Sequence, residues 1–199
     1  MLALILAGGE GSRLGLGEKS LVSIGGSPLI QHVVEAFEGA GCNVVIVLSK
    51  KTPYTHNWCR ARGIEHYTAR GAGFMEDIIE AVRALEEDEP LFTSVSDLPF
   101  LGKEIVSYIL ERYLEEGREA LSTWVPRSLT ARYGCRPVYL ERICGIEACP
   151  AGVNILTGAE ITRPQDELQL LVSDPRLAFN INTREDLALA QKWLDEGLM

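Results

Sequence analysis

The chain has 199 residues, of which 46% are hydrophobic and 24% charged, a composition typical of a soluble globular protein. Its net charge of −9 argues against non-specific nucleic-acid binding, which depends on Lys and Arg, so we expect no nucleic-acid partner. No apolar run approaches the roughly 20 residues that cross a membrane, and a basic signal-peptide segment is missing. We therefore expect a cytoplasmic protein with no membrane partner.

The first half of the chain alternates strands and helices. Residues 2–6 are a continuous apolar run, which predicts a strand buried on both faces. A glycine-rich loop, residues 7–19, follows it. A helix is then expected after Ser27 as N-cap and Pro28 in the first turn, ending at Gly39. Further elements are expected as a strand at 43–48, a helix at 53–62, a strand at 64–67 and a helix at 73–87.

The second half begins with a strand at 91–96, followed by Asp97 and a helix at 102–116. Residues 120–172 are rich in strand patterns. A short strand at 178–182 leads to a last helix that begins at Thr183, with Asp186 in a capping-box relation. This alternation predicts an α/β fold: one Rossmann-like domain over residues 1–199, with a mostly parallel sheet and helices on both faces.

Open α/β sheets bind ligands at the carboxyl ends of their strands, where the glycine-rich loop, Asp97 and Asn182 are expected to meet. The sequence patterns of two familiar phosphate-binding loops do not match residues 7–19. The dinucleotide pattern GxGxxG requires glycine where Leu14 stands, and the Walker A pattern requires glycine where Glu18 stands. These misfits disfavour an NAD-dependent dehydrogenase and a P-loop enzyme.

The loop fits a third pattern, AGGxGxRxG with a later lysine. Gly8, Gly9 and Gly11 allow the backbone to turn its N–H groups inward without a Cβ in the way. Arg13 supplies forked donors for phosphate oxygens and Lys19 adds a point charge. Two cations and a ring of amides suit a nucleoside triphosphate whose α-phosphorus is attacked.

Three stretches resemble a known family. Residues 3–21 resemble the signature loop of the MobA-like nucleotidyltransferases, which use a nucleoside triphosphate and release pyrophosphate. Residues 94–101 (SVSDLPFL) resemble the metal-binding aspartate strand end of that superfamily. Residues 179–190 resemble its closing NINTPEDL element, with Arg184 in place of the usual proline. Within the superfamily, residues 149–156 (CPAGVNIL) resemble the archaeal guanylyltransferases that act on adenosylcobinamide phosphate.

The resemblance implies transfer of GMP from GTP to adenosylcobinamide phosphate, with Mg²⁺ as cofactor. The clamp on the triphosphate is assigned to Arg13 and Lys19, and metal binding to Asp97 with Asn182. Guanine is expected near the glycine loop and residues 70–73. The predicted nucleotide-binding residues are Leu6, Ala7, Gly8, Gly9, Gly11, Ser12, Arg13, Lys19, Gly71, Asp97, Gly152, Asn154 and Asn180. An ionised acceptor phosphate needs no general base, which agrees with the absence of histidine from these motifs.

Several alternatives stay open. A molybdopterin guanylyltransferase or a sugar-phosphate nucleotidyltransferase would share the loop and Asp97, and only the acceptor would differ. A nucleotide-binding regulatory module without turnover would be expected to lose Arg13, Lys19 or Asp97, all of which are present. The sequence does not choose between Asn180 and Asn182 as the metal or phosphate contact, and a homodimer is an open alternative to a monomer.

Overall fold

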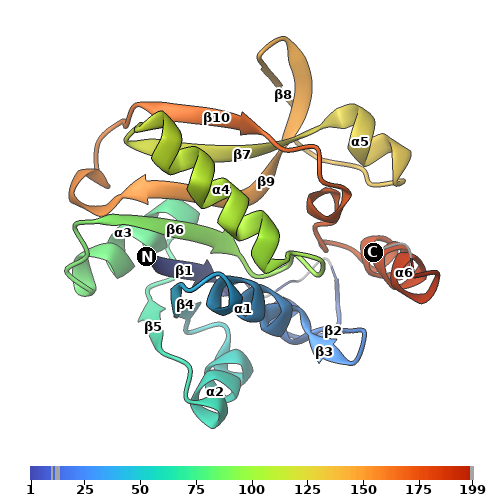
Figure 1. The fold of residues 1–199 in the computed structure, drawn as a ribbon. Helices are drawn as coiled ribbons and strands as arrows, with labels where there is room; N and C mark the ends of the chain where they lie inside the picture. The colour runs from blue at the N-terminus through green and yellow to red at the C-terminus, as the bar shows by residue number, and fades with distance from the viewer. Residues whose placement is uncertain (10, 12–13, 198–199) are drawn as a thin grey trace.

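The computed structural model describes residues 1–9, 11 and 14–197, which form an eight-stranded sheet and flanking helices (Figure 1). Along the sheet, seven strands follow the order β10-β7-β9-β6-β1-β4-β5, and β8 pairs with β9 at the side. The ladders β1–β4, β1–β6, β4–β5 and β10–β7 are parallel, whereas β9 runs antiparallel to its neighbours. The predicted mostly parallel sheet is confirmed.

The strands have the following bounds: β1 Leu2–Leu6, β4 Asn43–Ser49, β5 His66–Ala69, β6 Pro90–Val95, β7 Ala120–Pro126, β8 Glu141–Ile143, β9 Ile146–Thr157 and β10 Glu167–Leu171. The hairpin strands β2 Ser23–Ile24 and β3 Ser27–Pro28 form a separate small sheet. The helices are α1 Leu29–Gly39, α2 Pro53–Arg62, α3 Phe74–Ala84, α4 Lys103–Glu116, α5 Arg127–Arg132 and α6 Arg184–Asp195, with the 3₁₀ helices η1 Lys19–Leu21, η2 Gly158–Glu160 and η3 Pro175–Ala178.

Alternate residues of β1 belong to different hydrophobic cores, as the pleat of a strand requires. Ala3 and Ile5 pack in the core that holds side chains from α1, α2, α4 and α6. Leu4 packs in the opposite core, where it meets Ile78 and other side chains of α3. Both faces of the sheet are therefore covered by helices, as predicted.

Two local predictions are wrong. Ser27 does not cap a helix, because Ser27 and Pro28 pair with Ser23 and Ile24 in the β2–β3 hairpin, and α1 begins one residue later. The strand predicted at residues 178–182 does not form: Ala178 ends η3, and the Ile181 N–H donates to the Asp97 carbonyl just beyond β6 over 3.1 Å. The capping box of Thr183 and Asp186 is confirmed.

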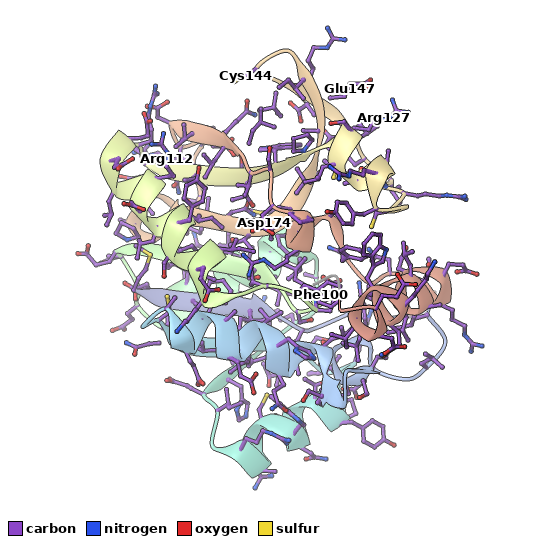
Figure 2. All side chains as sticks on the ribbon, turned by 45° about the vertical axis from the view of Figure 1, so that its right-hand side comes forward. Phe100, Arg112, Arg127, Cys144, Glu147 and Asp174 are labelled. Atoms are coloured by element: carbon purple, nitrogen blue, oxygen red, sulfur yellow. The ribbon has the colours of Figure 1, made fainter. Side chains whose placement is uncertain are left out.

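At one end of the sheet the β8–β9 hairpin projects outward, with Cys144 at its tip and the Arg127–Glu147 ion pair along its side (Figure 2). All five cysteines are free thiols. Within the described ranges, no helix combines the length and the apolar character needed to cross a membrane.

Candidate functional site

The loops that follow β1, β4 and β5 meet at Ser49. Its hydroxyl donates to the Gly8 carbonyl over 2.7 Å. A Cβ atom added at either Gly8 or Gly71 would lie only 3.2 Å from the Ser49 Cβ. The small residues at these positions therefore allow three loops to pack closely at the carboxyl edge of the sheet.

The loop that contains Gly71 is folded by an aspartate of the helix that follows it. Asp77, in the first turn of α3, accepts hydrogen bonds from the backbone N–H groups of Gly71 and Ala72 at 3.0 and 3.1 Å. Gly71 has a φ of +74°, a conformation that favours glycine. Gly71 and Gly8 both pack against Ser49, and the contact of Gly71 with guanine remains a prediction.

The glycine-rich loop turns back on itself at Gly11. Gly11 has a φ of +66°, and its carbonyl accepts from the N–H groups of Leu14 and Gly15 at 2.9 and 3.4 Å. A Cβ at Gly11 would lie 2.5 Å from the Cβ of Lys19. Only glycine therefore fits where the loop passes Lys19. The predicted contacts of Ser12 and Arg13 lie outside the described residues.

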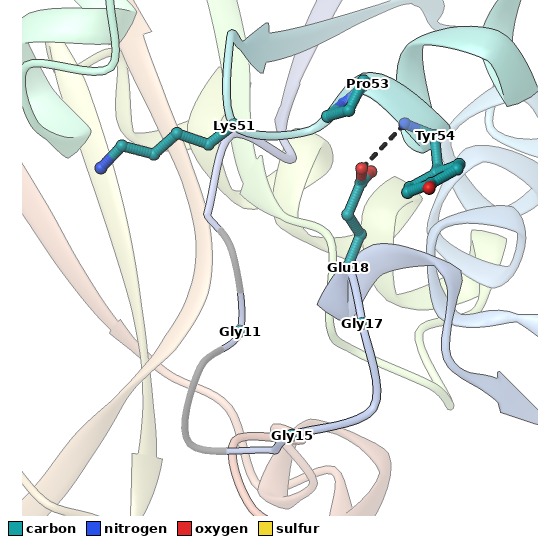
Figure 3. Close-up of a pocket in the computed structure, with 7 residues that line it drawn as sticks. All are labelled: Gly11, Gly15, Gly17, Glu18, Lys51, Pro53 and Tyr54. Carbon is teal, nitrogen blue, oxygen red and sulfur yellow. Dashed lines mark hydrogen bonds between the residues drawn. The ribbon is translucent and has the colours of Figure 1, made fainter.

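A cavity of about 380 Å³ adjoins this loop (Figure 3). Its lining is formed by Gly11, Gly15, Gly17, Glu18, Lys51, Pro53 and Tyr54. The Lys51 side chain extends away from Glu18, whereas the Glu18 carboxylate turns toward α2. The lining thus combines three glycines with one cationic and one anionic residue, Lys51 and Glu18, and with Pro53 and Tyr54.

Glu18, which breaks the Walker A pattern, caps a helix. Its carboxylate accepts from the backbone N–H groups of Tyr54 and Thr55, at 2.8 and 2.6 Å, and from the Thr55 hydroxyl. These N–H groups belong to the first turn of α2, which has no side-chain cap from its own N-cap residue, Thr52. The Glu18 carboxylate is thus held against the start of α2 by three hydrogen bonds.

Lys19, Asp97 and Asn182 meet as predicted, from three distant parts of the chain. The Lys19 ammonium forms an ion pair with the Asp97 carboxylate and donates to the Asn182 side-chain oxygen over 2.7 Å. The Asn182 amide in turn donates to the Asn180 side-chain oxygen over 2.7 Å. Beside this group, the hydroxyls of Ser20 and Ser96 share a hydrogen bond of 2.8 Å. The site thus holds one cation, one carboxylate and two amides in a chain of contacts.

Asp97 is almost fully buried, with only 7% of the residue exposed. Burial raises the pKa of Asp97 above its ordinary 3.8, while the Lys19 ammonium acts in the opposite direction. One carboxylate oxygen contacts Lys19, and the other, Oδ1, is buried with no hydrogen-bond partner among the described residues. A buried acceptor without a donor is costly, so this oxygen is suited to a further ligand.

The donor set fits a hard divalent cation that also binds phosphate. Within the ranges that the structure describes, no group of three or more His, Cys, Asp or Glu side chains is gathered. Asp97 instead supplies one carboxylate, and Asn182 and Asn180 supply amide oxygens at the same place. Mg²⁺ is usually held by one or two carboxylates, with phosphate oxygens and water completing its ligands.

The closing segment contacts the glycine-rich loop at a second point, which the sequence did not indicate. Arg184 donates from Nε to the Leu14 carbonyl at 3.0 Å and from Nη2 to the Gly15 carbonyl at 3.2 Å. Its place in the first helical turn was predicted, but these contacts were not. Only the spatial arrangement of two segments 170 residues apart could reveal them.

The remaining predicted residues lie at different depths in the sheet. Leu6 ends β1, and the N–H of buried Ala7 extends the pairing by donating to the Val47 carbonyl at 2.8 Å. Gly9 is exposed just beyond them.

On the other side of β6, Gly152 has a φ of +84°, and a Cβ there would lie 2.6 Å from a Val95 methyl carbon. Asn154 is paired with Thr93, four residues before Asp97, which places it about 13 Å away along the strand. Gly152 thus lies near the edge with Asp97, whereas a nucleotide contact of Asn154 remains a prediction.

The chain is similar in sequence to known proteins over nearly its whole length. A family model described as "MobA-like NTP transferase domain" matches residues 3–150. The chain is 29% identical to an adenosylcobinamide-phosphate guanylyltransferase of Methanocaldococcus jannaschii, over 98% of this chain and 97% of that protein. It is 30% identical to a probable molybdenum cofactor guanylyltransferase of Thermococcus gammatolerans, over 96% of this chain and 100% of that protein.

Solved structures share the fold at lower sequence identity. A hypothetical transferase from Thermus thermophilus superposes with a TM-score of 0.70 at 20% identity, covering 94% of this chain and 100% of that one. A CMP:2-keto-3-deoxy-manno-octonic acid synthetase complexed with CTP gives a TM-score of 0.71 at 15% identity, covering 98% of both chains. At these identities the likeness concerns the fold alone.

Proposed function

Because the chain belongs to the MobA-like NTP transferase family, we propose that it transfers GMP from GTP to adenosylcobinamide phosphate and releases pyrophosphate. One observation carries the proposal: a relative named for this reaction matches nearly the full length of both chains. A second candidate reaction, transfer to the molybdenum cofactor, is supported by the 30% identity to the Thermococcus protein. Both relatives are named guanylyltransferases, so the donor GTP is common to the two candidates.

In the proposed reaction, an oxygen of the acceptor phosphate forms a bond to the α-phosphorus of GTP. The bond from the α-phosphorus to the bridging oxygen of the β-phosphate breaks, and pyrophosphate leaves with that oxygen. The acceptor phosphate has a second pKa of about 6 and is largely ionised at neutral pH, so no side chain must remove a proton. The chain must instead bring two anions together and stabilise the charge on the leaving group.

The glycine-rich loop and Lys19 are suited to that task. Main-chain N–H groups around Gly8, Gly9 and Gly11 would bind the phosphates without adding a side chain, and the Lys19 ammonium would neutralise charge on them. Arg13 is proposed as the second cation on the same loop. Lys19 donates to Asp97 and Asn182, and an ammonium group has three N–H donors, so its third N–H would be available to a phosphate oxygen.

Asp97, with Asn182 or Asn180, is proposed to hold Mg²⁺ against the nucleotide phosphates. When bound, the ion would polarise the α-phosphoryl group and reduce the repulsion between donor and acceptor. The unpartnered Oδ1 of Asp97 supports this role, since it is an acceptor that the described residues leave unused. A cytoplasmic location and the oligomeric state stay predictions.

The proposal is tested by incubating the purified protein with GTP, Mg²⁺ and one acceptor at a time, and measuring pyrophosphate. We expect release with adenosylcobinamide phosphate and none with molybdopterin or glucose 1-phosphate. An Asp97→Asn variant is the control, because it keeps the shape of the side chain and removes its charge. Release with molybdopterin alone would establish the second candidate, and GTP binding without release from any acceptor would indicate a regulatory module.

A further inference from the structure

We infer that Arg184 is a positioning residue for the polyphosphate of the nucleotide: its guanidinium fixes the backbone of residues 14–16 in the glycine-rich loop. The inference rests on the proposed function, because it assumes that this loop binds a nucleotide. It concerns a residue outside the loop, 170 positions along the chain from the first carbonyl that it binds.

The geometry of the contact sets the direction of two peptide groups. Arg184 holds the carbonyl oxygens of Leu14 and Gly15, at 3.0 and 3.2 Å, on the side of the loop that faces α6. In a trans peptide the N–H points opposite to the carbonyl, so the N–H groups of Gly15 and Leu16 point away from α6. Figure 3 shows Gly15 between this helix and the cavity.

The two amides have different partners. The Gly15 N–H donates to the Gly11 carbonyl over 3.4 Å, which closes the turn of the loop. No described residue accepts a hydrogen bond from the Leu16 N–H. A donor held in place but unused by the protein is suited to a phosphate oxygen, and preorganised donors bind an anion without the entropic cost of ordering.

The helix that carries Arg184 is anchored independently of the loop. Ala190 of α6 is fully buried, and the Trp193 ring lies against Tyr133, with ring centroids 4.8 Å apart. The Thr183–Asp186 capping box fixes the first turn, where Arg184 begins the helix. Because α6 is anchored, the Arg184 side chain holds the loop carbonyls in a fixed position, which a side chain on a flexible tail could not do.

The side chain of Arg184 also neutralises charge in an acidic protein. The chain carries a net charge of −9, and within the described ranges no carboxylate forms an ion pair with the Arg184 guanidinium. Its full charge therefore acts on the loop carbonyls and on any anion behind them. The same residue both orients the loop and raises the local potential for a polyphosphate.

The test measures the dissociation constants of GTP and GMP, each with Mg²⁺, by calorimetry for the wild type, Arg184→Ala and Arg184→Lys. We expect Arg184→Ala to weaken GTP by about tenfold and GMP by much less, since GMP lacks the β- and γ-phosphates. Arg184→Lys keeps the charge and one donor group, so we expect an intermediate affinity for GTP. Arg112→Ala is the matched control, because the hydrogen bonds that Arg112 (labelled in Figure 2) makes to described residues go to Glu115 and Glu116 of its own helix.

Thermal unfolding without nucleotide separates positioning from simple stability. We expect a melting temperature close to that of the wild type for both Arg184 variants. Equal loss of GTP and GMP affinity together with a lower melting temperature would overturn the inference, as would unchanged GTP affinity. If Arg184→Ala fails to fold, the Arg184→Lys measurement decides. If the wild type binds GTP and the Arg184 variants bind it more weakly, the inference is supported. If the wild type binds no GTP, the proposed function and the inference are overturned together.

Discussion

At the scale of single residues, the decisive feature is the Lys19–Asp97 ion pair. The two side chains are only 17% and 10% exposed, so their interaction is weakly screened by water. A divalent cation at Asp97 would be repelled by the adjacent ammonium, and a triphosphate at Lys19 would be repelled by the adjacent carboxylate. Each ligand offsets the charge that repels the other, so nucleotide and metal are expected to bind cooperatively.

This coupling predicts the effect of Lys19→Met on metal binding. Without nucleotide, the variant should bind Mn²⁺ about tenfold more tightly than the wild type, because the competing charge next to Asp97 is gone. Mn²⁺ titration by electron paramagnetic resonance at alkaline pH, where protons compete least, measures the affinity. Lys103→Met makes the same charge change on the exposed start of α4 and should have no effect. Unchanged or weaker Mn²⁺ binding in Lys19→Met would contradict the coupling.

The residue types of the site could be predicted from sequence, because a strand end fixes what lies near it. Asp97 follows β6 and the glycine loop follows β1, and β1 and β6 are paired in the sheet. The unpredicted partners are long-range: Glu18 bonds to α2, and Arg184 bonds to Leu14. The sequence around Glu18 and Arg184 does not indicate these contacts, since a carboxylate or a guanidinium at such a position is compatible with many partners.

At the scale of elements, α2 depends on a residue that lies outside it. Glu18→Ala removes the acceptor for two helical N–H groups and the Thr55 hydroxyl. We expect a loss of about 0.5–2 kcal/mol in the free energy of unfolding, the range for a lost N-terminal cap, measured by urea denaturation. Glu18→Gln keeps one acceptor oxygen and should lose less. Equal stability of Glu18→Ala and the wild type would show that water replaces the carboxylate.

The 3₁₀ helix η3, which precedes the Asn180–Asn182 segment, is capped by Asp174. The carboxylate accepts from the Arg176 backbone N–H at 2.9 Å and from its guanidinium (Asp174 is labelled in Figure 2). Burial acts to raise the pKa of Asp174, but the contacts from Arg176 outweigh it and hold this pKa below the usual 3.8. The ionised carboxylate therefore stabilises the fold above its unfolded-state pKa, and this stabilisation is lost as the pH falls through the lower native pKa.

From this sign we predict the pH dependence of Asp174→Ala. At neutral pH the variant should lose about 1 kcal/mol of unfolding free energy, typical of a lost cap. The difference from the wild type should shrink once the pH falls below 3.8, because the wild-type carboxyl then becomes protonated. Urea denaturation at neutral pH and at a pH below 3.8 measures the difference in unfolding free energy between the variant and the wild type. Asp166→Ala, which removes a more exposed ion pair with Arg118, should change little at either pH; a constant Asp174→Ala difference would exclude the charge as its cause.

Most elements were predictable because their apolar periodicity is strong, and the failures have a common cause. The sequence predicts a strand at residues 178–182, and Phe179 is indeed extended, with φ −97° and ψ 106°. A strand also needs a neighbour with free backbone groups, which the sequence does not display. β5 begins at His66 rather than at Ile64 because the Ile64 N–H bonds back to the Cys59 carbonyl at the end of α2.

At the scale of the whole molecule, the site joins the start, middle and end of the chain: the loop after β1, the loop after β6 and the segment before α6. A ligand held by all three should stabilise the fold as a unit. At 100 times its Kd a ligand adds about 2.7 kcal/mol, and a domain of this size gains about 2–4 °C in Tm per kcal/mol.

We therefore predict that saturating GTP with Mg²⁺ raises the Tm by about 5–10 °C, measured by scanning fluorimetry. Removing the metal with EDTA should abolish most of the shift, because the phosphates then meet Asp97 without a cation between them. CTP serves as the control for the base and should shift the Tm less. A GTP shift that EDTA leaves unchanged would place the nucleotide away from Asp97.

The position of β9 has a consequence for how the protein is made. This strand lies between β6 and β7 and pairs with both, yet both precede it in the chain. Until residues 146–157 have left the ribosome, no strand lies between β6 and β7. The backbone N–H and C=O groups on the edge of β6 that later pairs with β9 then have no strand partner. The sheet is then completed by insertion of β9 between two strands that are already made, so the nascent protein exposes an unpaired strand edge from the synthesis of β6 until that of β9.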